Sequence, residues 1–332
     1  MTRRSEGLEV AVGTGALEVG GTVIEPGTRR RVEVPVARFV TGEWMVLPVE
    51  VIHGHRPGPR VWLSGAIHGD ELDGVEIIRE VLGELAPSRL RGAVLGIPVV
   101  NVSGFVAESR YLPDRRDLNR SFPGKAQGSM ASRLAHLFMT EVVERCQVGL
   151  DFHCGSDDRE NHPHIRANLD DDRTRELATA FGAPIMIHNK PPKGSLRKAA
   201  SRSGARTLVY EAGEAGRFTD AAIETGVAGT LRVLASLGMI DQAPAISTPS
   251  VEARSTHWVR APRSGICRIE AALGSEVRKG ERLGGVYELL GEKATRVRAG
   301  VGGIVIGRRV NPLVHQGEAV VHLARPDGHP PS

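Results

Sequence analysis

Between residues 60 and 211, apolar residues fall into short, nearly unbroken runs, and the segments between these runs have a helical spacing. Unbroken apolar runs of this length are typical of strands that are buried on both faces of a sheet. The predicted strands are 60–67, 93–100, 148–153, 183–188 and 206–211. Apolar residues three and four apart predict helices at 72–86, 129–145, 172–181 and 220–237. The alternation of the two predicts an α/β fold with parallel strands.

The two ends of the chain lack the three-to-four spacing of apolar residues that is typical of helices. Residues 1–58 have short alternating runs broken by Gly and Pro, which indicates a β-rich segment at the start of a large domain, 1–242. Residues 243–255 lose all periodicity and are expected to form a linker. Residues 256–325 are rich in Gly and Val and contain two similar halves. This pattern predicts a small all-β domain shaped as a barrel or a flattened sandwich.

Composition narrows the functional class. The 332-residue chain is 40% hydrophobic and carries a formal net charge of +4, yet only 4% of its residues are aromatic. Basic residues alternate with acidic ones, and no basic stretch carries the aromatic side chains that stack bases, so nucleic-acid binding is not expected. No apolar run approaches the ~20 residues of a membrane span, so no membrane association is expected.

The cysteines and the first residues bear on the compartment. The chain has three cysteines, an odd number, and they are far apart in the sequence, which argues against a disulfide framework. Residues 1–7 are charged and lack the apolar stretch of a secretion signal. The expected compartment is the cytoplasm. Whether the protein forms a homo-oligomer is left open.

Candidate metal ligands follow two of the predicted strands. His68 and Glu71 are three residues apart after the first strand, and His153 ends the third. Two imidazoles and one carboxylate are the ligand set of a catalytic zinc site with an open position, and open α/β sheets bind ligands at the carboxyl ends of their strands. The alternative is structural: His153 caps a strand, and Glu71 begins a helix, where the dipole favours a carboxylate.

A further carboxylate, Glu211, ends the last predicted strand. A carboxylate at that place could be the general base that takes a proton from an activated water. Glu214 is the local competitor, and Glu211 is preferred because it closes the strand directly. The alternative is a surface glutamate at the junction of a strand and a loop.

A third group of polar residues lies between 110 and 120. Arg110 and Arg120 carry planar guanidinium groups, which grip carboxylates through two bonds, and Asn119 adds a neutral donor and acceptor. Asp117 could hold one of the arginines in place. The alternative is a charged loop that is solvated and has no role in binding.

Four motifs together resemble one known family. The segments 65–71 (GAIHGDE), 117–120 (DLNR), 151–153 (DFH) and 210–213 (YEAG) are similar to those of the succinylglutamate desuccinylase/aspartoacylase family, a branch of the zinc carboxypeptidase superfamily. The resemblance extends over about residues 45–240. It implies a zinc-carboxypeptidase-like mixed sheet flanked by helices, followed by a small all-β barrel-like domain.

The resemblance also implies roles. His68, Glu71 and His153 would bind one zinc ion per chain, and Glu211 would act as general base and later as proton donor. Arg110 would polarise the scissile carbonyl, while Asn119 and Arg120 would hold a carboxylate of the substrate. The metal group lies in motifs 65–71 and 151–153, the base in 210–213 and the carboxylate-binding pair in 117–120.

The function that follows is a zinc-dependent amidohydrolase acting on linear amides, a deacylase of small N-acyl amino acids or related N-acylated amines. Two alternatives stay open at this point. One is a zinc carboxypeptidase acting on peptides, and the other is a metal-containing binding module without catalytic activity.

The C-terminal residues 256–325 resemble the biotinyl/lipoyl barrel. Lys293 lies near the expected hairpin tip, but the motif that surrounds a modified lysine is missing, so Lys293 is expected to be unmodified. The domain is expected to fold back and narrow the access to the zinc cleft.

Overall fold

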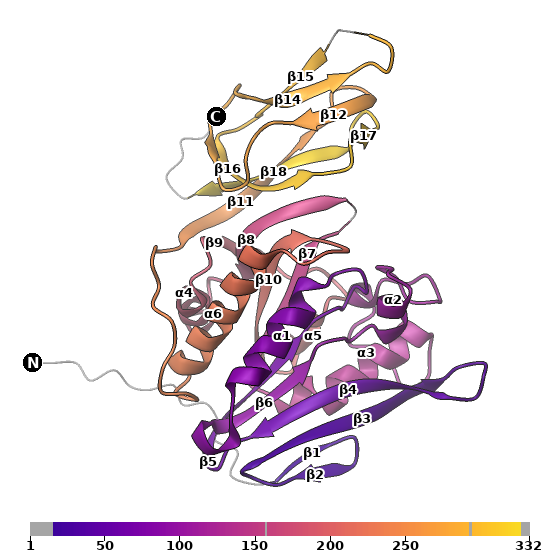
Figure 1. The fold of residues 1–332 in the computed structure, drawn as a ribbon, viewed down its shortest axis with the longest axis vertical. Helices are drawn as coiled ribbons and strands as arrows, with labels where there is room; N and C mark the ends of the chain where they lie inside the picture. Colours follow the sequence, from indigo (N-terminus) through magenta and orange to yellow (C-terminus); the bar gives the residue numbers. More distant parts are fainter. Residues whose placement is uncertain (1–15, 157, 292–293, 327–332) are drawn as a thin grey trace, which may run out of the picture.

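A large mixed sheet runs through the protein and continues into the C-terminal region (Figure 1). The computed structural model describes residues 16–156, 158–291 and 294–326. The sheet has twelve strands. In spatial order they are β13 (Glu276–Val277), β16 (Gly303–Arg309), β18 (Ala319–Pro326), β11 (Val251–Arg260), β9 (Ile185–His188), β8 (Arg159–Ala167), β10 (Arg206–Glu214), β7 (Val148–Gly155), β5 (Arg56–Ser64), β6 (Arg91–Ile97), β4 (Trp44–His53) and β3 (Thr28–Arg38).

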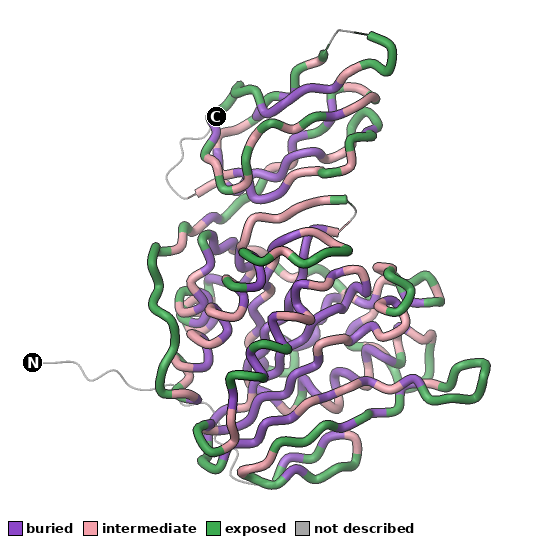
Figure 2. The backbone as a smooth tube through the Cα atoms, viewed as in Figure 1, coloured by how far each residue is buried: buried purple, intermediate pink, exposed green. Residues whose placement is uncertain are grey.

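Helices cover both faces of this sheet. They are α1 (Asp73–Glu84), α2 (Val102–Val106), α3 (Met130–Glu141), α4 (Asp172–Phe181), α5 (Leu196–Arg202) and α6 (Asp220–Ser236), with short 3₁₀ helices at Pro87–Arg89, Leu118–Arg120 and Val143–Arg145. Helices α1, α4 and α6 share one buried core with the sheet, and α3 and α5 share the core on its other face (Figures 1 and 2). The predicted α/β fold with a mixed sheet is confirmed.

Strand parity decides which side chains enter which core. In β7, Leu150 and Phe152 pack into the core beneath α1, α4 and α6. Successive side chains of a strand point to opposite faces, so Asp151 and His153 face the side of α3 and α5. The same alternation holds in β10, where Leu208, Tyr210 and Ala212 belong to the first core and Val209 and Glu211 do not.

The predicted elements agree with the observed ones except at their ends. The first predicted strand, 60–67, ends at Ser64, so His68 lies on the loop before α1 rather than at the strand terminus. The long predicted helix 129–145 ends as an α-helix at Glu141 and continues as a 3₁₀ turn. Strand β8 and helix α5 were not predicted. Strand β8 is rich in polar residues, and α5 has only seven residues.

The β-rich start of the chain adds strands to the edge of the main sheet. Strands β3 and β4 form an antiparallel pair, and β4 pairs with β6, so this segment is continuous with the parallel strands. A small hairpin of β1 (Leu17–Val19) and β2 (Thr22–Ile24) packs its buried side chains into the same core as α3.

The C-terminal region is all-β, as predicted. Four strands form a second sheet in the order β15 (Ala294–Arg298), β14 (Arg282–Tyr287), β12 (Gly265–Ile269) and β17 (Leu313–Val314). Its apolar residues share one core with those of β11, β16 and β18. Lys293 lies outside the described residues, so its predicted lack of modification stays a prediction.

One expected boundary differs from the structure. The predicted linker, 243–255, is irregular at its start, but its last five residues belong to β11. Residues Val251–Ala253 pair in parallel with β9, and the rest of β11 pairs with β18 of the C-terminal region. A single strand therefore joins the two regions, which sequence periodicity could not show because the strand begins within a Pro- and Ser-rich stretch. The division into domains stays a prediction.

Within the described ranges, no helix has both the length and the apolar composition needed to cross a lipid bilayer.

Candidate metal and substrate site

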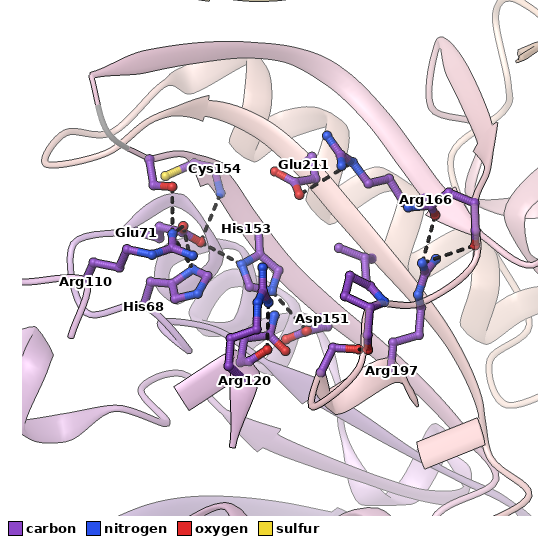
Figure 3. A pocket seen from close by; sticks show the side chains of 16 residues that line it. His68, Glu71, Arg110, Arg120, Asp151, His153, Cys154, Arg166, Arg197 and Glu211 are labelled. Atoms are coloured by element: carbon purple, nitrogen blue, oxygen red, sulfur yellow. Dashed lines mark hydrogen bonds and ion pairs between the residues drawn. The ribbon is translucent and has the colours of Figure 1, made fainter. Parts of the chain in front are cut away.

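Neighbouring strands of the sheet place Glu211 and His153 side by side. Glu211 of β10 lies opposite His153 of β7 on one side and His164 of β8 on the other. Two residues earlier in β10, Val209 lies between Asp151 of β7 and Arg166 of β8. Apart from His164, all of these residues line one pocket on the sheet face that carries α3 and α5 (Figure 3).

The loop between β5 and α1 supplies the other metal-type ligands. Strand β5 ends at Ser64, and Ala66 has a left-handed backbone with φ 44°. Such a conformation is uncommon for a residue other than glycine, and it is found where the surrounding structure imposes it. Ala66 and Ile67 are fully buried, so this turn is held by packing. It carries the chain to His68 and Glu71, which are also buried.

His68, Glu71 and His153 converge on one point. Each offers a ligand atom, and these atoms lie within 4.8 Å of one another. Nδ1 of His68 is 2.7 Å from Oε1 of Glu71, and Nδ1 of His153 is 2.7 Å from Oε2 of the same carboxylate. Two imidazole nitrogens and a carboxylate suit zinc, and three protein ligands leave a position for water or substrate. The donor set therefore fits a catalytic zinc ion.

A carboxylate lies behind each histidine. Oδ1 of Asp117 is 3.2 Å from Nε2 of His68, and Oδ2 of Asp151 is 3.0 Å from Nε2 of His153. Ser64 donates a hydrogen bond to the other oxygen of Asp151 at 2.8 Å. Metal-binding histidines usually donate their second ring N–H to such a carboxylate, which sets the tautomer and the ring orientation. This arrangement directs both Nδ1 atoms towards Glu71.

The electrostatics of the group favour positive charge. Burial alone would raise the pKa of Glu71, but His68 and His153 outweigh it and hold that pKa far below its usual range. Burial would lower the pKa of His153, but Asp151 and Glu71 outweigh it and raise that pKa well above the ordinary value. Three carboxylates therefore surround two imidazoles in a buried place, which is a suitable environment for a divalent cation.

Glu211 lies at the edge of the pocket and is held by two side chains of β8. Nδ2 of Asn161 donates to Oε2 of Glu211 at 3.0 Å, and Nε of Arg166 is 3.6 Å from Oε1. The competing carboxylate, Glu214, is not among the residues that line the pocket and forms an ion pair with Arg217 at 3.5 Å. A register shift in β10 between the two glutamates separates them. The geometry therefore favours Glu211 over Glu214.

Arg110 reaches the metal group from the loop after α2. It donates to Oδ2 of Asp117 at 2.9 Å and to Oγ of Ser156 at 2.7 Å, and it lies 3.6 Å from Oε1 of Glu71. Asp117 thus contacts both Arg110 and His68, in agreement with the expectation that it holds an arginine. A guanidinium in this place can donate to an oxygen that lies beside the metal group.

Asn119 and Arg120 line the same pocket from the other side. The side-chain oxygen of Asn119 accepts a hydrogen bond from the backbone N–H of Leu196 at 2.9 Å, which leaves the Nδ2 group as its donor towards the pocket. Arg120 is exposed, and its guanidinium donates to the backbone oxygen of Asn119 at 2.7 Å. The other arginines of this loop, Arg115 and Arg116, do not line the pocket.

Two pocket arginines were missed by sequence reasoning, Arg166 and Arg197. Arg197 is only 7% exposed, and its Nη2 donates to Oδ1 of Asn189 at 2.8 Å. Burial lowers the pKa of Arg197 to about 10, so the side chain stays charged at neutral pH. Among the described residues, none accepts a hydrogen bond from its Nη1. A buried, charged donor without a partner indicates a place for an anionic ligand group.

No local signal in the sequence separates these arginines from others. Arg166 lies in β8, a strand rich in polar residues, and Arg197 lies in the first turn of α5, a seven-residue helix. Only the order of strands and the docking of α5 bring both beside the metal group.

Cys154 and His164 lie beside these residues and make structural contacts. Cys154 is buried, and its backbone N–H donates to Oε2 of Glu71 at 3.3 Å. His164 is buried between the backbone oxygen of His162 and the Nε of Arg166. Of the described residues, only His68, Glu71 and His153 form a group that could hold a metal ion.

The described residues of the C-terminal region do not line the pocket. All residues in its wall lie between His68 and Glu211. The expectation that the C-terminal domain narrows the cleft therefore has no direct contact to support it in the described part of the chain.

Part of the chain is similar in sequence to a known catalytic domain. A sequence model of the succinylglutamate desuccinylase/aspartoacylase catalytic domain matches residues 57–237, just over half of the chain. This range contains every residue of the metal group and of the pocket wall.

Individual relatives extend the similarity to most of the chain. The N-alpha-acetyl-L-2,4-diaminobutyric acid deacetylase of Halomonas elongata is 28% identical over 296 residues, which cover 84% of this chain and 86% of that protein. A crystal structure of a succinylglutamate desuccinylase/aspartoacylase from Rhodobacter sphaeroides has a TM-score of 0.82 at 26% identity, covering 90% of this chain and 96% of that one.

A third likeness is to the product-bound ectoine utilization protein EutE (DoeB) from Ruegeria pomeroyi. It has a TM-score of 0.81 at 24% identity and covers 89% of this chain and 95% of the other. At this identity the likeness shows the shared fold, and it includes the C-terminal region because almost the whole of each chain is covered.

Proposed function

The chain belongs to the succinylglutamate desuccinylase/aspartoacylase family, and from this premise we propose that it is a zinc-dependent amidohydrolase. Its substrates would be N-acyl amino acids or related N-acylated amines, and it would hydrolyse their linear amide bond. The observation that carries the proposal is the convergence of His68, Glu71 and His153 beside a pocket-lining carboxylate, Glu211. The deacetylase activity named for the relative from Halomonas elongata supports the same reaction class.

The metal group would hold one zinc ion. When bound, zinc supplies Lewis acidity for hydrolysis of a carbonyl compound. Asp117 and Asp151 keep the Nδ1 atoms of the two histidines available by binding the Nε2 atoms.

Glu211 is the proposed general base and later the proton donor. Its carboxylate takes a proton from the attacking water and returns it to the leaving amine nitrogen, so that one residue serves both halves of the reaction. Arg110 has the place and the charge to donate hydrogen bonds to the carbonyl oxygen of the scissile amide as negative charge develops there.

The substrate carboxylate is proposed to bind Arg120 and Asn119, as inferred from the sequence. Arg197 adds a third donor, because its Nη1 atom is buried in the pocket wall and none of the described residues accepts a hydrogen bond from it. Guanidinium groups bind carboxylates through charge-assisted hydrogen bonds, often two at a time. A pocket with these three donors, two of which are guanidinium groups, would prefer an acid to its neutral amide.

A substrate panel tests this proposal. The purified protein, with its zinc content measured, is assayed for free-amine release from N-acetyl and N-succinyl amino acids and from dipeptides. We expect turnover of N-acyl amino acids, its loss on chelation and its recovery with zinc. Preference for dipeptides would indicate a carboxypeptidase, and absence of turnover with full zinc would indicate a binding module.

A matched pair of variants tests the metal group itself. His153→Ala should lose zinc and activity together, while His315→Ala, at an exposed position of the C-terminal region, should keep both. Full zinc occupancy in His153→Ala protein would contradict the ligand assignment.

A further inference from the structure

Strand β8 is shared between the catalytic sheet and the C-terminal region. Its residues 164–167 pair with β9, but residues 159–161 pair with Gly307, Arg308 and Arg309 of β16. Since β9 pairs with β11, β11 with β18 and β18 with β16, these five strands close into a ring. The two regions are therefore joined twice by hydrogen-bonded strands, once where β9 pairs with β11 and once where β8 pairs with β16.

Additional bonds hold β16 against the start of β8. Arg308 donates to Oε2 of Glu160 at 2.9 Å, and the backbone N–H of Val310 donates to the oxygen of Asp158 at 2.8 Å. Nδ2 of Asn311 donates to Oδ2 of Asp158 at 3.0 Å. These contacts fix the register of β16 against the residues of β8 that precede Asn161.

Asn161 connects this junction with the active site. Its Nδ2 donates to Oε2 of Glu211 at 3.0 Å. Its partner residue across the junction is Gly307, and a Cβ atom added at Gly307 would lie 2.9 Å from Oδ1 of Asn161. The backbone of Gly307 therefore packs against one end of the amide, while the other end binds Glu211.

We propose that the C-terminal β region positions the general base, with Gly307 fixing the Asn161 amide and Asn161 orienting Glu211. The inference rests on the proposed function, since it takes Glu211 as the base. Asn161 and Gly307 are positioning residues. In this arrangement the C-terminal region acts on the chemistry through β8, although its described residues do not line the pocket.

Gly307→Ala is the variant that separates this role from general stability. The backbone of Gly307 lies outside the left-handed region, and the close atom is the end of the Asn161 side chain rather than backbone. The added methyl group should therefore displace the amide and leave the strand intact. We expect kcat to fall ~10-fold, part of the ~10²–10⁴-fold that a general base contributes, with KM and zinc content unchanged.

Gly285→Ala is the matched control. It lies in β14 of the same region, and its nearest neighbour, Cβ of Ala294, would be 3.5 Å away, an ordinary contact distance. It should keep the wild-type kcat. Thermal unfolding of both variants shows whether they fold.

A double-mutant comparison tests the route through Asn161. Asn161→Ala should lower kcat by itself, and it removes the atom that the new methyl group would meet. Gly307→Ala should then have no further effect in the Asn161→Ala background, because residues that act through one contact are not additive. An equal effect in both backgrounds would overturn the proposal, as would a normal kcat in Asn161→Ala.

The contacts of the Asn161 side chain can also be followed by NMR, without measuring turnover. In protein labelled with ¹⁵N-asparagine, the side-chain amide signal of Asn161 should shift in Glu211→Ala and in Gly307→Ala, and should stay in place in Gly285→Ala. An unchanged signal in Gly307→Ala would overturn the proposal. If the wild-type protein hydrolysed no N-acyl compound, the proposed function and the catalytic part of this inference would fall together, while the signal would still report the contact.

Discussion

The metal group is built from residues that each have a second contact. His68 and His153 touch Glu71 with one ring nitrogen and an aspartate with the other. Glu211 is likewise held through both carboxylate oxygens. At the scale of single residues, the site thus depends on the side chains that contact the metal ligands and Glu211 as much as on those residues themselves.

Asp151→Asn should weaken zinc binding while it keeps the shape of the side chain. The amide retains an oxygen for Ser64 but no longer provides the negative charge behind His153. Loss of such a partner typically lowers metal affinity ~10–100-fold. Zinc affinity is measured by competition with a chelator, and an affinity equal to wild type would show that Asp151 does not orient His153.

Glu211→Gln should keep zinc and substrate binding but lose most of kcat, because an amide cannot take the proton of water. The expected loss is ~10²–10⁴-fold. Glu214→Gln is the control, since Glu214 lies outside the pocket wall and pairs with Arg217. Steady-state kinetics compare the two, and the reverse outcome would move the role to Glu214.

Arg120→Ala should reduce the preference for a substrate acid over its carboxamide, and Arg197→Met should do the same. Loss of a charge-assisted contact costs about 1.5–3 kcal/mol, which would appear mainly in kcat/KM for the acid. Arg116→Ala is the control, because its side chain is 64% exposed and outside the pocket. Equal use of acid and carboxamide by the wild-type protein would contradict the carboxylate-binding role.

At the scale of elements, the close packing of β5 against β7 limits the size of the side chains that fit between them. Trp62 is fully buried, and its ring lies over Gly149 of the neighbouring strand. This close packing keeps β5 and β7 in register, and the register places Ser64 beside Asp151.

Gly149→Ala should therefore destabilise the protein. Its Cβ would lie 1.9 Å from the Trp62 ring, and overpacking of this kind costs about 1–3 kcal/mol. Gly83→Ala is the opposite control, because Gly83 is an exposed residue of α1 with nothing within 4 Å of the new methyl group. It should stabilise by about 0.5–1 kcal/mol. Urea unfolding measures both, and equal stability of the two variants would contradict the packing argument.

At the scale of the whole molecule, the ring of strands that joins the two regions contains a buried histidine. His322 of β18 is 3% exposed and stacks on Trp258 of β11 with ring centroids 3.9 Å apart. Burial, followed by the charges of Arg166 and Arg159 and by His257, lowers the pKa of His322 to about 3. The folded protein thus keeps this imidazole neutral.

This histidine makes stability depend on pH in a defined direction. In the unfolded chain His322 has an ordinary pKa of about 6.5, so between pH 6.5 and 3 the unfolded state binds a proton that the folded state does not. The free energy of unfolding should therefore fall as the pH drops below 6.5, with a contribution of about 2 kcal/mol at pH 5.

His322→Phe keeps a ring on Trp258 and removes the titration. The difference in unfolding free energy between pH 7 and pH 5 should be smaller in this variant than in the wild-type protein. Chemical denaturation at the two pH values checks it, and an identical difference in both proteins would assign the acid sensitivity to other groups.

Local sequence was enough for the elements and for the ligand motifs. Apolar runs and three-to-four spacing depend on one strand or helix at a time, so β5, β7, β10, α1, α4 and α6 could be predicted within a few residues. The motifs that contain His68, Glu71, His153 and Glu211 are short, and each lies at the end of such an element, so they were recognisable before the fold was known.

The tertiary structure decided which distant residues meet these motifs. Asn161, Arg166 and Arg197 lie in a polar strand and a short helix, and nothing in their local pattern distinguishes them. Asn161 reaches Glu211, and Arg166 reaches the pocket, because β8 is inserted between β10 and β9. Arg197 reaches the pocket because α5 packs on that face of the sheet. Strand order and register depend on contacts between residues far apart in the chain, and one residue of slip would turn every side chain of β8 to the other face.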